Sequence, residues 1–491
     1  MSRMERLYPA LKDKVMSAEA AAALIGPDQT VGCSGFTVVG YPKAVPAAIA
    51  RLGRAANMTL LTGASVGDPL DGELARSGLV SHRFPYQTNK SMRDAINGGQ
   101  IQYADQHLSH TPAMLERGAG PKVDTAIIEC AAVTADGLIP AAAVGASDSY
   151  VHCARQVIVE LNSALPLGLA GMHDIYSPAL IGEPIPLTGV MDRIGTPFIP
   201  CPPEKIAAVV LTHDIGDCPS FKPADAVSQA IADNIVAFLK SEVAAGRQPP
   251  SLAPLQSGVG SVANAVLSGL SGGGFSGLRM FTEVLQDSAL NLIRSGAVIG
   301  ASCTSLSLSE AAQEELFSRI GFYRDRIVIR PQEVSNHPEL VRRLGLISMN
   351  TPIECDIYGN VNSTHVLGTR IMNGIGGSGD FARNAGLTIF ATASTAKDGN
   401  ISCIVPMCSH VDHTEHDVMV IVTEQGVADL RWKSPRERAR CIIEHCAHPD
   451  FRPMLRAYFD AACAAGGHTP HLLAEALSWH VRCQNTGSMR L

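Results

Sequence analysis

The sequence lacks any apolar run near the roughly 18 residues that a membrane-spanning helix needs, so we expect no membrane association. It also lacks an excess of basic residues: 39 lysines and arginines stand against 46 acidic residues, for a net charge of −7. Without a basic bias, nucleic acid is not an expected partner. Only 17% of the 491 residues are charged and 46% are hydrophobic, a composition that favours folded domains over a disordered chain.

Residues 1–15 lack the apolar core of a secretory signal and mix basic with acidic side chains. The 13 cysteines are odd in number and are scattered from Cys33 to Cys483. We interpret them as reduced thiols of an intracellular protein, most of them core fillers. We therefore expect a cytoplasmic location, with the mitochondrion as the alternative if the protein is eukaryotic.

Short apolar segments alternate with helical patterns along the whole chain. They predict strands at 30–33, 58–61, 123–129, 157–161, 206–211, 297–301, 326–329 and 346–349. Such alternation is typical of an α/β fold with mostly parallel sheets covered by helices. Segments 157–162 and 420–425 also resemble each other, which hints at two similarly built domains. We place these domains at 1–222 and 223–491.

A polar trio follows an apolar run in residues 281–287, FTEVLQD. Val284 and Leu285, with later apolar residues, fit one helical face, so we expect a helix to start here. Glu283 would then lie where a strand meets a helix, at the strand ends where open α/β sheets carry their chemistry. We interpret Glu283 as a covalent nucleophile towards a thioester. The alternative is a first-turn glutamate favoured by the helix dipole.

Two glycine-rich segments are candidate anion-binding loops. Residues 258–264 open a predicted helix, and residues 374–379 contain four glycines in six positions. Backbone N–H groups left uncovered there can cradle an anion or a developing oxyanion; the alternative is a tight structural turn. The second loop lacks a Walker lysine and the G-x-G-x-x-G spacing, which argues against a nucleoside triphosphate or a dinucleotide. Lys397 is a candidate phosphate partner or a solvated loop lysine.

A histidine-rich run, residues 410–416, contains His410, His413 and His416. Histidine and acidic side chains can bind metals, but no remote ligand is evident, and we expect structural roles and no metal. A second cluster, residues 441–448, lies in an apolar helical pattern and is interpreted as packing. The chain also lacks a G-x-S-x-G nucleophile elbow with a convincing triad.

Several of these segments together carry a family resemblance: SGFTVVGYPK from Ser34, LQSGVGSVANAV from Leu255, FTEVLQDS from Phe281, NGIGGSGDFARN from Asn373 and VPMCSHVDHTEHD from Val405. The chain resembles the acetyl-CoA hydrolase/transferase family of class I CoA-transferases. In particular, it is similar to the succinyl-CoA:acetate and propionyl-CoA:succinate CoA-transferases of that family.

The resemblance implies two α/β domains of related topology, with the active site between them, and a homodimer. It assigns the nucleophile to Glu283, the oxyanion donors to the backbone N–H groups of Val259 and Gly377, and polar active-site positions to Asn336 and Glu424. The implied CoA contacts are Gly258, Val259, Gly260, Ser261, Val262, Ile353, Asn373, Gly377 and Lys397. Ser261 departs from the family, where many members carry Asn, and the effect should be mild because this loop acts through its backbone.

The implied activity is transfer of CoA between a short-chain acyl-CoA (acetyl-, propionyl- or succinyl-CoA) and a small carboxylate such as acetate, propionate or succinate. It would proceed through a glutamyl-CoA thioester, with CoA as substrate and no permanently bound cofactor or metal. Two alternatives stay open: a short acyl-CoA hydrolase using the same site, and a non-catalytic CoA- or metabolite-binding protein on this fold.

Overall fold

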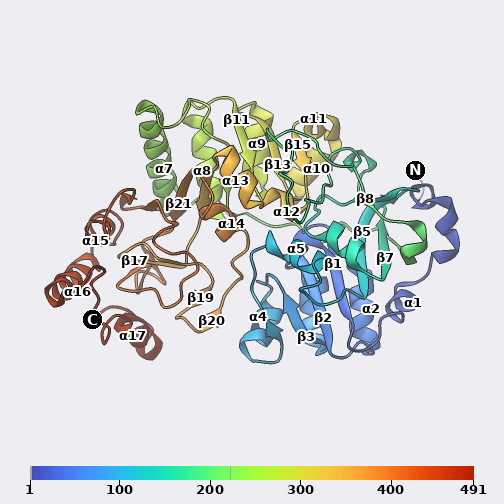
Figure 1. Ribbon diagram of the computed structural model, residues 1–491, viewed down its shortest axis with the longest axis horizontal. Helices are drawn as coiled ribbons and strands as arrows, with labels where there is room; N and C mark the ends of the chain where they lie inside the picture. The colour runs from blue at the N-terminus through green and yellow to red at the C-terminus, as the bar shows by residue number, and fades with distance from the viewer. Residues whose placement is uncertain (1–2, 222) are drawn as a thin grey trace. The chain divides into compact units, whose positions relative to one another are not determined.

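The computed structural model describes residues 3–221 and 223–491 and divides by its internal contacts into two compact units (Figure 1). Unit 1 comprises Met1–Ser220, Met280–Ile293 and Ile299–Leu344, and unit 2 comprises Phe221–Arg279, Arg294–Val298 and Gly345–Leu491. The units therefore do not follow one break in the chain, because two later segments pack with the N-terminal part. The two domains at 1–222 and 223–491 stay a prediction.

Unit 1 is built on a nine-stranded sheet whose main strands are parallel, as the alternating pattern predicts. All nine residues of its central strand β5 are buried, as expected for a parallel strand covered on both faces. An antiparallel branch, β6 Gly137–Pro140 and β8 Ile199–Pro200, extends from β5. The parallel strands lie in the order β4 Gln102–Tyr103, β3 Val80–Phe84, β2 Met58–Ser65, β1 Thr30–Thr37, β5 Thr125–Val133, β7 Gln156–Asn162 and β9 Ile206–Thr212.

The helices of the N-terminal part of unit 1 connect these strands, and β1, β2 and β3 lie side by side in blue (Figure 1). A buried apolar cluster joins α1 and α2 to β1 and β2 through residues such as Ile49 and Leu60. The backbone N–H groups that begin α2 are held by Glu160, whose carboxylate accepts from Val45 at 2.6 Å. The helices are α1 Ala18–Ala22, α2 Ala44–Leu52, α3 Glu73–Ser77, α4 Lys90–Asn97, α5 His110–Glu116 and α6 Ser147–Cys153.

The later segments of unit 1 correct one prediction. Val284 and Leu285 do not begin a helix: they form the short strand β12, which pairs in parallel with β14, Ser305–Leu306. That long-range pairing outweighs the local helical pattern, and α9 begins only at Asp287 and ends at Ser295. The other elements here are β13 Val298–Cys303, β15 Ile327–Ile329, α10 Glu310–Ser318, α11 Ile320–Arg324, α12 Gln332–Ser335 and α13 Pro338–Leu344.

Unit 2 contains the strand series β10 Leu255–Ser257, β16 Ile347–Asn350, β21 Leu387–Ala391, β25 Val420–Thr423 and β26 Gly426–Asp429. The first four are parallel, and β25 and β26 form an antiparallel hairpin. The major helices are α7 Ala226–Ala244, α8 Ser261–Gly272, α14 Ser378–Ala382, α15 Pro435–His445, α16 Arg452–Ala465 and α17 Ser478–Thr486.

Beside this series, unit 2 has a small sheet and two short hairpins. The sheet comprises β17 Glu354–Asp356, β18 Val361–Asn362 and β24 Ile404–Val405. The hairpins are β19 His365–Val366 with β20 Arg370–Ile371, and β22 Thr395–Ala396 with β23 Ile401–Ser402. Within residues 3–221 and 223–491, no helix has both the length and the apolar character needed to cross a membrane. The fold is thus α/β with mostly parallel sheets.

Candidate functional site

Glu283 lies in the turn between β11, Leu278–Phe281, and β12. Its backbone carbonyl accepts hydrogen bonds from the N–H groups of Thr304, at 2.9 Å, and Ser305, at 3.2 Å. Its neighbours Thr282 and Val284 are buried, while Glu283 itself is partly exposed. The turn therefore fixes the backbone of a glutamate that is itself partly exposed.

Asn336 lies directly beside this carboxylate. It is fully buried, and its Nδ2 donates a hydrogen bond to Glu283 Oε1 at 2.7 Å. The hydroxyl of Ser335 donates to Asn336 Oδ1 at 2.7 Å, which fixes the amide with its NH₂ group towards Glu283. A donor so placed stabilises the ionised glutamate and restricts its rotamer. Of the predicted site residues, the structure thus brings Glu283 and Asn336 into contact within unit 1.

An apolar cluster adjoins the Glu283 turn. Its buried members are Phe36, Ala64, Leu108, Ala143 and Val284, and the partly buried Val39 and Tyr86 pack against it. Burial raises the pKa of the Tyr86 hydroxyl, and the negative charge of Glu283 raises it further. A carboxylate beside a small apolar surface is suited to a short acyl chain attached to a polar carbonyl. Tyr86 carries no local sequence pattern that marks it as a site residue, so only the structure places it beside Glu283.

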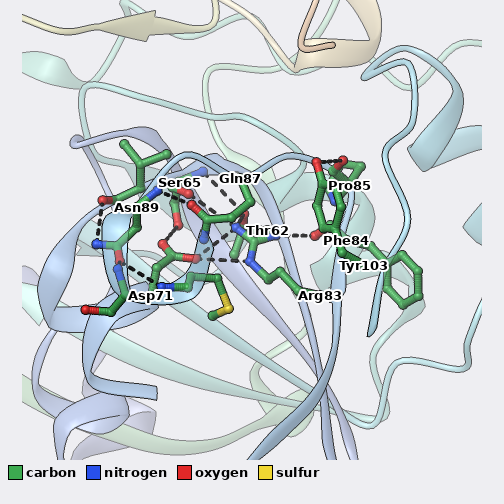
Figure 2. Close-up of polar contacts among 12 residues, drawn as sticks. Thr62, Ser65, Asp71, Arg83, Phe84, Pro85, Gln87, Asn89 and Tyr103 are labelled. Carbon is green, nitrogen blue, oxygen red and sulfur yellow. Dashed lines mark hydrogen bonds and ion pairs between the residues drawn. The ribbon is translucent and has the colours of Figure 1, made fainter. Parts of the chain in front are cut away.

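Arg83, three residues before Tyr86 in the chain, forms a buried ion pair with Asp71 (Figure 2). Arg83 and Asp71 are both fully buried, with Nη2 and Oδ1 2.9 Å apart. Arg83 also donates to Thr62 Oγ1 at 2.8 Å and to the carbonyl oxygen of Phe84. Burial raises the pKa of Asp71 against the opposing effect of the arginine. The network ties the ends of β2 and β3 together, the strands that lead to the apolar cluster.

The first glycine loop connects β10 to α8 in unit 2. The N–H of Gly258 donates to the carbonyl of Met349 at 2.9 Å, and Gly260 has φ of 110° at the N-cap of α8. A Cβ at Gly260 would meet nothing within 4 Å, so the backbone conformation, not crowding, favours glycine there. Val259 is 52% exposed, and Val262, in the first turn, is partly exposed. Ser261 Oγ accepts a hydrogen bond from Ser228 at 3.3 Å.

The second glycine loop leads into α14, also in unit 2. Asn373 Nδ2 donates to the carbonyls of Ser363 and Gly374, both at 2.9 Å. Gly376 has φ of 58°, a left-handed conformation that favours glycine. Gly377 is the N-cap of α14, and its carbonyl accepts from Phe381 at 3.1 Å. The loop is thus pinned at both ends by hydrogen bonds.

The remaining predicted residues also belong to unit 2. Glu424 accepts from the N–H of Ser394 at 2.8 Å, from the Ser394 hydroxyl, and from Gln425 Nε2 at 2.9 Å. Burial opposes ionisation of Glu424, but these hydrogen bonds outweigh it and hold the pKa below its ordinary value. Lys397 is exposed in the turn of the β22–β23 hairpin, and the N–H of Ile353 donates to the carbonyl of Asn362 at 2.8 Å. Across residues 3–221 and 223–491 there is no group of three or more His, Cys, Asp or Glu side chains arranged for a metal.

Two family models match the chain. The acetyl-CoA hydrolase/transferase N-terminal domain matches residues 1–211, and the C-terminal domain matches residues 313–459. The chain belongs to the acetyl-CoA hydrolase/transferase family. The resemblance carried by its motifs is thereby confirmed.

The similar relatives include proteins named CoA-transferase and proteins named acetyl-CoA hydrolase. It is 53% identical over 490 residues to succinyl-CoA:acetate CoA-transferase of Clostridium kluyveri, covering 98% of this chain and 91% of that protein. It is 44% identical to propanoyl-CoA:succinate CoA transferase of Escherichia coli, covering 96% and 98% of the two chains. It is 46% identical to acetyl-CoA hydrolase of Schizosaccharomyces pombe, covering 94% and 93%.

Solved structures of similar fold include RipA from Yersinia pestis, with a TM-score of 0.72 and 23% identity over 95% of this chain and 100% of that one. A 4-hydroxybutyrate CoA-transferase from Porphyromonas gingivalis has a TM-score of 0.63 and 20% identity over 92% and 98%. At these identities, the structural similarity shows that this chain shares their fold. It does not assign functional residues, which must be argued from the site itself.

Proposed function

We propose that this protein is a CoA-transferase that moves CoA between a short-chain acyl-CoA (acetyl-, propionyl- or succinyl-CoA) and a small carboxylate (acetate, propionate or succinate). Glu283 is the nucleophile of the proposed reaction. The observation that carries the proposal is the 2.7 Å hydrogen bond from Asn336 to a partly exposed Glu283 carboxylate. The named activities of the relatives from Clostridium kluyveri and Escherichia coli support the same class of reaction.

The proposed reaction begins when a Glu283 carboxylate oxygen attacks the thioester carbonyl and expels CoA thiolate, which leaves a mixed anhydride. The thiolate then attacks the glutamyl carbonyl and releases the first carboxylate, so that Glu283 carries CoA as a thioester. A second carboxylate attacks that thioester and expels CoA thiolate, which leaves a new mixed anhydride. The thiolate then attacks the acyl carbonyl of this anhydride, forms the new acyl-CoA and releases the Glu283 carboxylate. Every step exchanges one leaving group for one nucleophile, with no net proton transfer, and the covalent route divides one difficult exchange into easier steps.

Each tetrahedral intermediate in this route carries an oxyanion. We assign its donors to the backbone N–H groups of Val259 and Gly377, because glycine-rich loops leave such groups accessible. Removing one preorganised oxyanion donor typically slows a reaction by about 10²–10³-fold. We also assign Glu424 a polar role in the reaction, and its lowered pKa keeps it ionised near neutral pH.

We assign CoA binding to the two glycine loops and to neighbouring positions. Lys397 can pair with a phosphate, since its side chain is exposed at a hairpin turn. Binding energy from the remote nucleotide part of CoA can be used to favour the central covalent steps. CoA is a substrate here, and no permanently bound cofactor is part of the proposal. The residues are Gly258, Val259, Gly260, Ser261, Val262, Ile353, Asn373, Gly377 and Lys397.

The deciding experiment is incubation with acetyl-, propionyl- or succinyl-CoA followed by intact-protein mass spectrometry. We expect an added mass of one CoA, mapped by proteolysis to Glu283 and absent from Glu283→Ala. Glu314→Gln is the matched control, because Glu314 is an exposed glutamate of α10 in the same unit. Absence of an adduct with every acyl-CoA would favour the second candidate, a non-catalytic CoA- or metabolite-binding protein.

A short acyl-CoA hydrolase is a further candidate, because relatives named acetyl-CoA hydrolase match the chain over almost its whole length. The two activities differ in whether water reaches the anhydride and the glutamyl thioester. Turnover of acetyl-CoA should therefore be slow in buffer alone and should rise with added acetate, propionate, butyrate or succinate. Full turnover without any carboxylate would identify a hydrolase.

We also propose a homodimer and a cytoplasmic location, or a mitochondrial one if the protein is eukaryotic. All 13 cysteines are free thiols, as expected in a reducing compartment. Light scattering at the exit of a sizing column measures the assembly: a mass of twice 51.8 kDa is expected, and a monomer mass contradicts the dimer.

A further inference from the structure

The histidine-rich run, residues 410–416, contacts the second glycine loop within unit 2. The run is anchored to β18 by an antiparallel bridge between His413 and Val361. The N–H of Val361 donates to His413 O at 2.8 Å, and the N–H of Asp412 donates to Val361 O at 2.9 Å. This backbone pairing places the adjacent side chains of Asp412 and His413 at the two ends of the second glycine loop.

His413 reaches the end of the loop that contains Gly377. Its side chain is buried at 2% exposure, its ring packs on Phe390 at a centroid distance of 4.8 Å, and its Nε2 lies 3.1 Å from Ser378 Oγ. Ser378 Oγ also donates its single hydrogen to the carbonyl of Ile375 at 2.8 Å. The serine oxygen must then accept from His413, so Nε2 carries the proton. The imidazole thereby fixes the residue that directly follows Gly377.

Asp412 reaches the other end of the loop, which contains Asn373. Its side chain is 6% exposed, and its Oδ2 accepts from the N–H of Ser363 at 2.6 Å and from Thr364 Oγ1 at 2.9 Å. The carbonyl of Ser363 in turn accepts from Asn373 Nδ2 at 2.9 Å, and the carbonyl of Thr364 accepts from the N–H of Met372 at 2.8 Å. Asp412 thus holds the short turn on which Asn373 rests.

The other two histidines of the run differ from His413. The ring of His410 packs against that of His365, with centroids 3.9 Å apart and planes tilted by 37°, and its Nε2 lies 3.2 Å from Asp412 Oδ1. The side chain of His416 is 78% exposed and lies 3.8 Å from Glu415. His410 therefore supports Asp412, whereas the exposed His416 serves as a matched control from the same run.

We propose that Asp412 and His413 are positioning residues that hold the second glycine loop in register, His413 at the Gly377 end and Asp412 at the Asn373 end. The inference rests on the proposed function, in which Gly377 donates to the oxyanion and Asn373 contacts CoA. Asp412 and His413 of the histidine-rich run then support the backbone donors of the loop.

Substitutions of His413 and of Asp412 test the two ends of the loop separately. His413→Leu keeps the side-chain volume and removes the N–H, so kcat should fall about ten- to a hundredfold while KM for acyl-CoA stays within about threefold. His413→Gln restores an N–H near the Nε2 position and should bring kcat back to within about threefold of the unchanged protein. Asp412→Asn removes an acceptor at the Asn373 end, so KM for acyl-CoA should rise about tenfold, with a smaller effect on kcat. His416→Gln should change neither constant.

A double-mutant cycle guards against a general loss of folding. Ser378→Ala removes the acceptor of the His413 hydrogen bond, so the double variant His413→Leu/Ser378→Ala should be no slower than the slower single variant. Thermal unfolding and circular dichroism are measured for each variant, and constants are compared below the lowest Tm. Additive losses, unchanged kcat in His413→Leu, or losses in kcat and KM that only follow Tm would overturn the proposal.

The CoA adduct at Glu283 distinguishes failure of this proposal from failure of the proposed function. If the adduct forms at the same rate in the unchanged protein and in His413→Leu, Glu283 is the nucleophile and His413 has no positioning role. If no adduct forms in the unchanged protein, both the proposed function and the positioning role are contradicted. Slower adduct formation in His413→Leu, restored in His413→Gln, supports both.

Discussion

The amide of Asn336 and the carboxylate of Glu283 are 53 residues apart in the chain and 2.7 Å apart in space. Ser335 orients the amide, and the backbone of Glu283 is held by Thr304 and Ser305. Both partners are therefore fixed by independent contacts before any substrate binds, which is the arrangement that a covalent nucleophile needs.

Asn336→Ala removes the hydrogen bond to this carboxylate. Because a hydrogen bond to a charged group contributes about 1.5–3 kcal/mol, kcat/KM should fall about 10- to 100-fold. Steady-state kinetics with acetyl-CoA and succinate measure the effect, and the rate of CoA adduct formation should fall in parallel. Gln229→Ala, which removes an exposed amide from α7, is the control. An unchanged rate in Asn336→Ala would show that the amide does not assist Glu283.

Arg83→Met leaves the carboxylate of Asp71 buried without its cation. Breaking one partner of a buried pair costs about 3–5 kcal/mol, so the free energy of unfolding in denaturant should fall by that amount. Arg51→Met breaks the exposed pair with Glu19, whose side chains are 60% and 56% exposed, and should lower the free energy of unfolding far less, because solvent screens the pair. Equal losses in the two variants would contradict the structural role assigned to the buried network in Figure 2.

Gly260→Ala tests the first glycine loop. Alanine at φ of 110° is strained by about 1–3 kcal/mol, so the loop must shift, and KM for acyl-CoA should rise about tenfold. Gly272→Ala is the matched control at the other end of α8, where a Cβ meets nothing within 4 Å and φ is not left-handed. If both substitutions leave KM unchanged, the first loop does not bind CoA.

Glu333 lies in α12, which ends just before Asn336, and it should make the protein less stable as the pH rises from about 4.5 to about 8. Burial raises its pKa from 4.5 to about 8, and the nearby charges of Asp148 and Glu116 add to the rise. A raised carboxyl pKa means that the folded state holds the proton more tightly, so stability is greatest below about pH 4.5 and falls as pH rises to about 8. Glu333→Gln should flatten that part of the profile in denaturant titrations at several pH values, and Glu314→Gln should not. Identical profiles for Glu333→Gln and the unchanged protein would refute the shift.

Several features of the fold follow from local sequence alone. Buried parallel strands such as β5 and β7 are nearly uninterrupted apolar runs, and α7 is marked by Asp225, whose side chain accepts from the N–H of Ser228 at 2.7 Å. The glycine loop before α8 could also be read from residue types, because a left-handed φ favours glycine. The family motifs mark Glu283 and the two glycine loops as candidate functional residues.

Other features depend on partners far away in the chain. Val284 and Leu285 have a helical pattern, yet they form β12 because β14 offers an edge to pair with. Tyr86 lies beside Glu283 and His413 contacts Ser378 for the same reason. Residues 280–293 and 299–344 likewise pack with the N-terminal part of unit 1.

The sequence by itself determined the α/β class, because apolar periodicity is written in neighbouring residues. The family and the candidate nucleophile Glu283 came from contiguous motifs, such as FTEVLQDS, that resemble those of the family. Only the tertiary structure decided which amide faces Glu283 and which side chains brace the second glycine loop, because such contacts join residues tens of positions apart and depend on which strand edges meet.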